Sequence, residues 1–322
     1  MTKDYVLREL QEHPDRFVSG AFLADRLQIT RAAVWKAVEQ LRREGYPIES
    51  VPRRGHRLSA GYDVLSEAGI RRYLSRSDLQ IRVYSTITST NTVLKQMALE
   101  DAPSGLALVA GEQTAGRGRL GRSFYSPSGS GLYLSLLLRP DLSAAEATSL
   151  TACAAVSTAE ALESLADVKA GIKWVNDILV DGKKVCGILT EAGLDCETGR
   201  MSYVIIGIGV NTKVPSGDFP EELREIAGSA FGEKTIPDLR NRLAALIMEK
   251  LMKYSADPSD SAVFEEYRRR SLAPGKHIRI LSPGREPVLA EALDLERDYS
   301  LLVRREDGST ELLRSGEISI RF

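Results

Sequence analysis

The feature of this sequence that most restricts its fold is an ordered pair of short helices near the N-terminus. Residues 21–27 are expected to form the first helix, with Ser19 as its N-cap. After a tight turn, Thr30 is expected to cap a second helix that runs to about Glu44, where Gly45 ends it. Two helices joined by so short a turn are typical of a helix-turn-helix motif.

A basic hairpin follows the second helix. Residues 46–51 alternate as a strand, residues 52–55 form a turn, and residues 56–58 return. Arg53 and Arg54 lie at the tip of this hairpin. A hairpin in this position is typical of a wing, which contacts DNA phosphates or enters the minor groove.

The charge of this segment favours DNA as its partner. In residues 1–60, 11 Lys and Arg stand against 8 Asp and Glu, and the second helix turns polar and basic residues outward. We therefore predict DNA contacts by five residues: Thr30, Arg31, Lys36, Arg53 and Arg54. The alternative is a small helical protein-interaction domain with a solvated basic face.

Composition excludes several other classes of protein. The 322 residues carry 43 Lys and Arg against 44 Asp and Glu, so the chain as a whole is not a basic nucleic-acid binder. No apolar run reaches the roughly 18 residues of a membrane span, and the charged N-terminus is not a signal peptide. Three cysteines without a CxxC pair (Cys153, Cys186 and Cys196) indicate a reducing compartment, and the three histidines lie too far apart in sequence for a zinc site. We expect a cytoplasmic protein of two or three domains, without a membrane partner, whose first boundary lies near residues 60–64.

A loop rich in glycine and arginine follows a strand expected at residues 106–110. Gly116, Gly118 and Gly121 match a GxGxxG string, but a strand at residues 132–136 comes next and no helix does. A dinucleotide-binding fingerprint must open a helix, so this match is not one. The loop also carries three arginines, whose guanidinium groups fit phosphate oxygens: Arg117, Arg119 and Arg122. We predict a phosphate-binding loop; a solvated flexible loop and a nucleic-acid contact are the alternatives.

A second basic segment forms a hairpin. Strands are expected at residues 178–180 and 185–189, joined by a DG turn. The residues before the first strand suit a polyanion with a metal-bridged phosphate: Lys173, Asn176 and Asp177. A simple turn is an alternative explanation for Asn176 and Asp177. Lys184 begins the second strand, and the residues alone favour an ordinary surface lysine there.

Two further segments contain candidate ligand-binding residues. Residues 203–211 are expected to form a buried strand whose two glycines allow close approach to the backbone, although core packing also explains them. Residues 85–91 end a strand and begin a helix that Ser89 or Thr90 caps. The same hydroxyl groups and the amide of Asn91 are able to bind a polar ligand, but capping is the simpler explanation.

The C-terminal part changes from helices to short strands. Helices are expected at residues 66–74, 237–254 and 262–269. Strands are expected at residues 278–280, 288–295, 301–303 and 312–320, with turns at Pro283-Gly284 and Asp307-Gly308. Four or five short strands in about 50 residues indicate a small SH3-like barrel.

Five motifs together resemble the biotin–protein ligase family. They are STN at residues 89–91, GRGRLGR at 116–122, KWVND at 173–177, KKVCGIL at 183–189 and GIGVN at 207–211. With the helix-turn-helix, the whole chain is similar to the bifunctional subgroup, in which the ligase is also the repressor of the biotin operon. The resemblance implies an α+β protein in three parts. These are a winged helix-turn-helix at residues 1–62, a mixed-sheet catalytic domain related to class II synthetases and lipoate ligases at 63–271, and an SH3-like β-barrel at 272–322.

The resemblance also implies a reaction and partners. The family joins biotin to ATP and forms biotinyl-5′-adenylate and pyrophosphate. Mg²⁺ is expected to enter with ATP, and no other metal is expected. It then transfers biotin to one lysine of a carrier, typically the biotin carboxyl carrier protein of acetyl-CoA carboxylase and other biotin carriers. The adenylate is the implied corepressor, and a homodimer that carries it is implied to bind operator DNA. A ligand-sensing repressor without ligase activity and a lipoate–protein ligase are the alternatives.

The family's residue roles are implied for matching positions of this sequence. The implied catalytic residues are Lys184, Arg119 and Lys173. The implied biotin contacts are Ser89, Thr90, Asn91, Gln113, Arg117, Gly118, Arg119, Lys184 and Gly187. The implied ATP contacts are Arg119, Arg122, Phe124, Lys173, Asn176, Asp177 and Asn211. Leu120, Phe124 and Val175 replace a basic residue, a tryptophan and a proline that are common in the family, which is expected to alter ATP affinity without removing a catalytic group.

Overall fold

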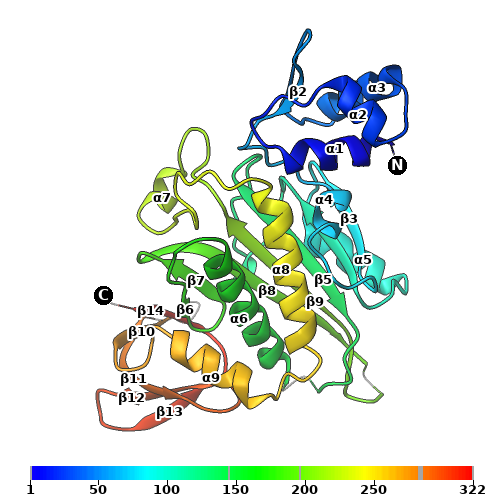
Figure 1. Ribbon diagram of the computed structural model, residues 1–322. Coiled ribbons are helices and arrows are strands. Elements are labelled where there is room, and N and C mark those ends of the chain that lie inside the picture. Colours follow the sequence, from blue (N-terminus) through cyan, green and yellow to red (C-terminus); the bar gives the residue numbers. More distant parts are fainter. Residues whose placement is uncertain (1, 144–145, 196, 282–285, 321–322) are drawn as a thin grey trace. The chain divides into compact units, whose positions relative to one another are not determined.

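The computed structural model of the chain describes residues 2–143, 146–195, 197–281 and 286–320 (Figure 1). The chain divides into two compact units. The first consists of Met1–Tyr73 and Lys234–Arg242, and the second of Leu74–Glu233 and Leu243–Phe322. The domain boundaries expected after residues 62 and 271 stay predictions.

The first unit contains the expected helix-turn-helix and hairpin. Its elements are α1 (Thr2–Glu12), α2 (Gly20–Arg26), α3 (Arg31–Arg43), β1 (Ile48–Val51), β2 (Gly55–Leu58) and α4 (Glu67–Arg71). Both predicted N-caps are confirmed, because Ser19 Oγ accepts a hydrogen bond from Phe22 N at 3.0 Å and Thr30 Oγ1 accepts one from Ala33 N at 3.1 Å. Strands β1 and β2 pair antiparallel and form the wing.

The sequence expectations missed α1 and misjudged α4. Helix α1 buries three residues among those described: Val6, Glu9 and Leu10. Val6 and Leu10 nevertheless complete the core of the unit together with α2 and α3. The helix expected at residues 66–74 is shorter, because it ends at Arg71 after Ser66 has capped it.

A polar cluster fixes the segment around α4 to the start of α8 (Leu239–Tyr254) within the first unit. Arg240 Nε lies 2.8 Å from Asp63 Oδ2, and both side chains are nearly buried. The amide of Asn241 accepts a hydrogen bond from Ser66 N at 3.0 Å and donates one to Val64 O at 2.7 Å. These contacts replace a free linker with a segment held by its own polar groups.

The second unit is built on a seven-stranded mixed sheet in the order β3-β4-β5-β9-β8-β7-β6. The strands are β3 (Gln80–Tyr84), β4 (Leu106–Ala110), β5 (Gly131–Leu138), β6 (Gly171–Lys173), β7 (Asp177–Val180), β8 (Lys183–Leu194) and β9 (Met201–Asn211). The helical elements are α5 (Thr90–Leu99), η1 (Arg119–Gly121), α6 (Ala147–Leu165), α7 (Glu221–Arg224) and α9 (Ser261–Arg270). Figure 1 shows α6 and α8 in front of the sheet. The strand expected at residues 106–110 is confirmed, and the other four expected strands of this region each lie inside a longer observed strand.

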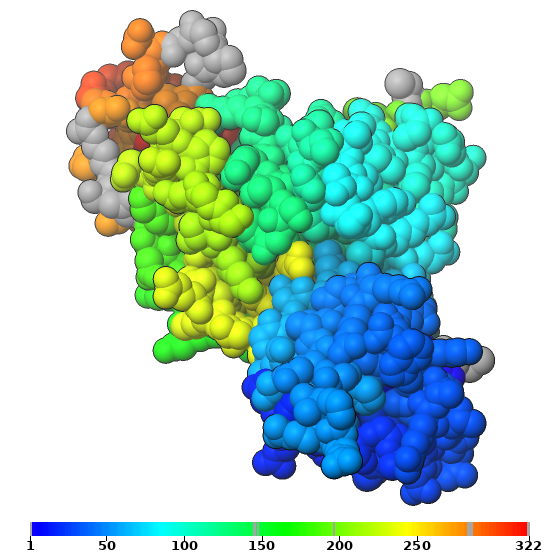
Figure 2. Space-filling model, turned by 90° about the horizontal axis from the view of Figure 1, so that it is seen from above, coloured from blue at the N-terminus to red at the C-terminus, as the bar shows by residue number. Residues whose placement is uncertain are grey.

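A second sheet follows α9 in the C-terminal part. Its five antiparallel strands are β10 (His277–Leu281), β11 (Val288–Leu295), β12 (Leu301–Arg305), β13 (Thr310–Leu313) and β14 (Glu317–Ile320), in the order β13-β12-β11-β10-β14. The single strand expected at residues 312–320 is wrong: a turn divides it into β13 and β14, and Gly316 in this turn has a φ of 126°. The expected turn at Pro283-Gly284 lies outside the described residues. These strands, orange to red in Figure 2, gather at one end of the second unit.

The described residues contain no helix that is both long enough and apolar enough to cross a membrane. Cys153 and Cys186 are buried as free thiols, and burial raises the pKa of both, that of Cys153 to about 12. Cys196 lies outside the described residues.

Candidate active site

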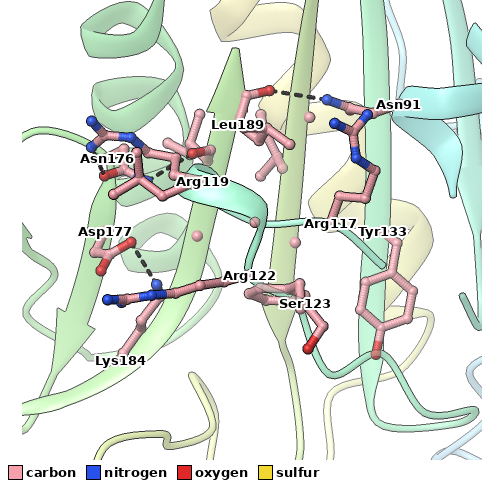
Figure 3. A pocket seen from close by; sticks show the side chains of 18 of the residues that line it. Asn91, Arg117, Arg119, Arg122, Ser123, Tyr133, Asn176, Asp177, Lys184 and Leu189 are labelled. Atoms are coloured by element: carbon pink, nitrogen blue, oxygen red, sulfur yellow. Dashed lines mark hydrogen bonds and ion pairs between the residues drawn. The ribbon is translucent and has the colours of Figure 1, made fainter. Parts of the chain in front are cut away.

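A cavity of the second unit lies over the middle of the sheet, between the start of α5, strands β8 and β9, and the glycine–arginine loop that joins β4 to β5 (Figure 3). It contains about 890 Å³ of empty space, part of which is open to solvent. Its lining residues are Ser89, Thr90, Asn91, Gln113, Arg117, Gly118, Arg119, Leu120, Arg122, Ser123, Phe124, Tyr133, Lys173, Trp174, Asn176, Asp177, Lys184, Gly187, Ile188, Leu189, Gly207, Ile208, Gly209 and Glu317. Five cationic side chains and two carboxylates are among them, so the wall suits an anion.

Glycines make the floor of the cavity. Gly187 of β8 and Gly209 of β9 lie opposite each other in the strand register, and the ring of Phe124 lies on both. A Cβ atom at Gly209 would come within 2.5 Å of this ring, and one at Gly187 within 3.1 Å. Tyr133 meets the Phe124 ring edge-on, with 6.4 Å between the ring centroids. Gly209 of the GIGVN segment therefore lets the Phe124 ring lie directly on the strand backbone. Core packing between neighbouring strands does not by itself explain this glycine.

The polar end of the cavity is a hydrogen-bonded network at the start of α5. Ser89 caps this helix, with its Oγ 3.4 Å from Thr92 N. Thr90 donates from its backbone N and from Oγ1 to Gln113 Oε1, at 2.9 and 3.1 Å, and Gln113 Nε2 donates to Ser126 Oγ at 3.0 Å. These groups are oriented before any ligand arrives, which lowers the cost of ordering them.

Asn91 is turned from the same helix toward β8. Its Nδ2 donates to Leu189 O at 3.2 Å and to Glu191 Oε2 at 3.0 Å, and its Oδ1 accepts from Ser135 Oγ at 2.6 Å. Gly207 leaves room for this amide, since a Cβ atom there would lie 2.1 Å from Asn91 Oδ1. The Asn91 side chain thus connects α5 to two strands.

The glycine–arginine loop is folded on itself over the cavity. Gly118 N donates to Arg122 O at 2.7 Å, and Phe124 N donates to Gly116 O at 2.9 Å. Between them, the single turn η1 places Leu120 at a φ of 55°, with 60% of its surface exposed.

Each arginine of this loop meets an acceptor from another part of the second unit. Arg117 pairs with Glu191 at 3.0 Å, and Arg122 pairs with Glu317 at 2.7 Å. Arg119 donates to Asn176 Oδ1 at 2.8 Å and to the backbone oxygen of residue 316 at 2.9 Å. The loop therefore contacts both the hairpin β7–β8 and the C-terminal sheet.

Lys184 points into the cavity and does not stand on the hairpin surface. Its Nζ lies 2.7 Å from Asp177 Oδ1, and 32% of its side chain is exposed (Figure 3). The register between β7 and β8 shifts beside it, since Lys184 is opposite Leu179 whereas Cys186 is opposite Ile178. Such a bulge redirects side chains. The neighbouring Lys183 points away from the site, and its Nζ donates to the backbone oxygens of Arg224 and Glu225 at the end of α7.

The Lys-Trp segment forms the remaining wall. Lys173 ends β6, and Trp174 is buried, with Nε1 donating to Tyr299 O at 2.8 Å. Asn176 Nδ2 donates to Ile188 O at 2.8 Å. These bonds hold the segment between β8 and the C-terminal sheet, so its polar groups stand at fixed positions around the cavity.

The structure brings together all the predicted ligand residues except Asn211. Asn211 ends β9 and does not line the cavity; its backbone oxygen accepts from Ala230 N at 2.8 Å. The sequence expectations missed the apolar wall and three groups that come from distant strands: Tyr133, Glu191 and Glu317. A carboxylate within a strand beside KKVCGIL was a weak signal for Glu191, and no motif marked the other two.

The predicted DNA contacts lie on the first unit. Thr30 is the N-cap of α3, and Arg31 and Lys36 are exposed on that helix. Arg53 occupies the wing tip at a φ of 67°, and the guanidinium of Arg54 lies 4.3 Å from the ring centroid of Phe17. A second hollow of the chain lies between α3 and the wing, with Arg31 and Arg53 in its wall.

Comparisons with known proteins give two family matches. The model of the biotin/lipoate A/B protein ligase family matches residues 83–211, and a model of an HTH domain matches residues 2–57. The bifunctional ligase/repressor BirA of Bacillus spizizenii is 45% identical over 223 residues, which cover 68% of each chain. BirA of Salmonella typhimurium is 30% identical over 95% of this chain and 93% of its own length. The biotin protein ligase from Aquifex aeolicus in complex with biotin and ATP superposes with a TM-score of 0.61 at 28% identity, covering 75% of this chain and 98% of that one.

Proposed function

Because the chain belongs to the biotin/lipoate A/B protein ligase family, we propose that it is an ATP-dependent biotin–protein ligase and also a biotin-responsive transcriptional repressor. The observation that carries this proposal is the cavity over the sheet. It collects residues from five separate sequence motifs, and its wall is predominantly cationic. Two relatives, BirA of Bacillus spizizenii and of Salmonella typhimurium, are named bifunctional ligase/repressor.

The first half-reaction joins two anions. A carboxylate oxygen of biotin attacks the α-phosphorus of ATP, the bond from this phosphorus to the bridging oxygen breaks, and pyrophosphate leaves. In the second half-reaction the amine of a carrier lysine attacks the carbonyl carbon of biotinyl-5′-adenylate, loses a proton, and releases AMP. No covalent enzyme intermediate is needed, so fixed positive charge and orientation account for the catalysis.

The proposed residue roles are those that the family resemblance implies, and the positions around the cavity support them. Ser89, Thr90 and Gln113 would hold the ureido ring, because their polar groups are already oriented at the buried end. Asn91 would support that end from behind, since its amide is bonded to the strands. Gly187 would let the ligand reach the floor, beside the Phe124 ring that is proposed to stack on adenine.

The charged groups would act on the phosphates. Arg117, Arg119 and Lys184 would neutralise the biotin carboxylate and the α-phosphate, and Lys173 and Arg122 the pyrophosphate. Magnesium would enter with ATP and be held by oxygen ligands from Asn176 and Asp177. The Asp177 carboxylate is in the cavity wall and forms an ion pair with Lys184, which is compatible with this role.

The C-terminal sheet would complete the ATP site. We assign it the SH3-like barrel architecture of the family, and the contacts of Arg119 and Arg122 with residues 316 and 317 support a role beside the glycine–arginine loop. The carrier protein is proposed to approach the same opening.

The repressor half would use the first unit. Thr30, Arg31 and Lys36 on α3 and Arg53 and Arg54 on the wing are the proposed DNA contacts. A homodimer that carries biotinyl-5′-adenylate would place two such surfaces on a palindromic operator.

The experiment that tests the ligase half is ATP–pyrophosphate exchange with biotin or lipoate as the acid. We expect exchange with biotin and transfer of biotin to one lysine of a biotin carrier domain, seen by mass spectrometry. Exchange with lipoate in place of biotin would favour the lipoate ligase. No exchange with either acid, together with tight biotin binding, would favour a sensor without ligase activity.

A further inference from the structure

An exposed tryptophan lies on the recognition helix α3. Trp35 is 60% exposed, whereas the other tryptophan of the chain, Trp174, is 3% exposed and hydrogen-bonded. Trp35 does not serve the core of the first unit, because the buried face of α3 is complete without it: Val34, Ala37, Val38 and Leu41. An aromatic side chain of this size in solvent is a marker of a contact surface.

The surroundings of Trp35 are cationic. It lies one helical turn after Arg31 and next to Lys36, both of which are exposed. The acid one turn further along, Glu39, is paired with Arg42 at 2.6 Å. The Arg42 Nε in turn donates to Ile48 O of β1 at 2.8 Å, so this flank of α3 adjoins the wing.

The second hollow of the chain supports a ligand between these two elements. Its wall contains Arg31 from α3 and Arg53 from the wing tip, together with residues 19–21 at the start of α2 and Ser50 and His56 of the wing. Trp35 thus stands on the same flank of α3 as a hollow bounded by two arginines.

We propose that Trp35 determines operator specificity by packing its indole ring against the C5 methyl group of a thymine in the major groove. This inference rests on the proposed repressor function. The residues in the N-terminal half of a recognition helix meet base edges, and Trp35 is the fifth residue of α3. The thymine methyl is the apolar group that the major groove exposes, and a large apolar side chain among cations is its chemical complement. A cation that contacts a phosphate carries no sequence information, whereas the indole ring would meet a group that only thymine presents in the major groove.

The test uses duplexes that the wild-type chain, with biotin and ATP present, selects from a random pool. Each thymine of a selected duplex is replaced in turn by uracil, which removes only the methyl group. For the wild type we expect one position at which uracil lowers affinity about fourfold, the effect of losing one buried methyl group. For Trp35→Ala we expect at least a tenfold loss on the selected duplex, no further loss at that uracil, and unchanged affinity for random DNA.

The matched control is Tyr5→Ala, which removes another exposed aromatic ring from the same unit but from α1. It should bind all duplexes as the wild type does. Biotin-dependent exchange activity and thermal unfolding of both variants report whether the chain is folded. Acrylamide quenching gives a direct readout, because Trp174 is buried: the exposed component of the fluorescence should be protected by the selected duplex and be missing in Trp35→Phe.

Three results would overturn the inference. In the first, Trp35→Ala binds the selected duplex as tightly as the wild type. In the second, Trp35→Ala lowers the affinity for the selected duplex, but every loss caused by uracil in the wild type is also seen in the variant. The ring would then contact sugar or phosphate instead of a thymine methyl group. In the third, the variant loses self-association in sedimentation while each protomer still binds half-sites normally, so the ring serves a second copy of the chain. A wild type that selects no sequence would refute the repressor function and this inference with it, whereas selection that is indifferent to Trp35 would refute the inference alone.

Discussion

Replacing Lys184 by alanine is expected to abolish adenylate formation while the fold survives. The Nζ of Lys184 is a cation in the cavity wall, 2.7 Å from Asp177. Its backbone is held independently of the side chain, because Lys184 N donates to Ile226 O at 2.8 Å and Gly228 N donates to Lys184 O at 2.9 Å. The alanine variant keeps these bonds, and with them the position of the hairpin.

Two magnitudes decide between loss of stability and loss of chemistry. The ion pair with Asp177 is partly exposed, with 32% of the Lys184 side chain and 17% of the Asp177 side chain in solvent. A pair of this kind contributes about 1 kcal/mol or less to stability. A preorganised charge at the transition state contributes about 3–4 kcal/mol, or a 10²- to 10³-fold rate factor. The catalytic effect is therefore the larger one.

The assay is biotin-dependent ATP–pyrophosphate exchange, with thermal unfolding measured on the same preparation. Lys183→Ala is the matched control, because the adjacent lysine is 40% exposed and its amine bonds backbone oxygens outside the cavity. We expect at least a hundredfold loss for Lys184→Ala, and less than threefold for Lys183→Ala. Exchange within threefold of the wild type for Lys184→Ala, or equal losses in both variants, would refute the reasoning.

Three further predictions follow from single contacts. Gly209→Ala should lower the free energy of unfolding by about 1–3 kcal/mol, because the new Cβ would lie 2.5 Å from the Phe124 ring. Adding Phe124→Ala to this variant should reduce the loss, and additive effects of the two substitutions on thermal unfolding would contradict the reasoning. Glu191→Gln keeps an oxygen that accepts from Asn91 Nδ2 but removes the ion pair with Arg117. The KM for biotin should therefore rise by up to about fivefold, while the thermal unfolding curve stays unchanged. The hydrogen bond from Arg269 lowers the pKa of Glu266 to about 2, against the effect of burial, so its charge stabilises the fold above about pH 4.5 and this contribution disappears as the pH falls toward 2. Urea unfolding of Glu266→Gln should therefore show a deficit on the order of 1 kcal/mol at pH 7 that vanishes near pH 2, and a deficit independent of pH would contradict the assignment.

Local signals explain why much of the fold was predictable from the sequence. Ser19 caps α2 and Thr30 caps α3. In each case the side-chain oxygen accepts a hydrogen bond from the backbone amide three residues further along the chain. Such contacts are written in consecutive residues, as are the alternations of the strands. Helix α1 has only a narrow apolar stripe, formed by Val6 and Leu10, and these two residues pack in the core that α2 and α3 share.

The site was predictable only where motifs mark it. The cavity collects the five motifs because β5, β9 and β8 are neighbours in the sheet, an order that no local pattern encodes. Glu191 and Glu317 reach Arg117 and Arg122 across 74 and 195 residues of sequence, so their partnership depends on the finished fold. The position of Lys184 likewise depends on a register shift, and for this reason the residues alone favoured a surface lysine.

The measurement that tests the central claim most directly is operator affinity of one preparation, with and without biotin and ATP, beside its ligase activity. A chain that makes biotinyl-5′-adenylate and senses it should bind a selected duplex about 5- to 150-fold more tightly when both substrates are present. Arg53→Glu combined with Arg54→Glu should remove that binding and flatten its salt dependence, while biotin transfer to the carrier stays near normal. Operator affinity that ignores biotin and ATP, or that survives the charge reversal of the wing, would contradict the account.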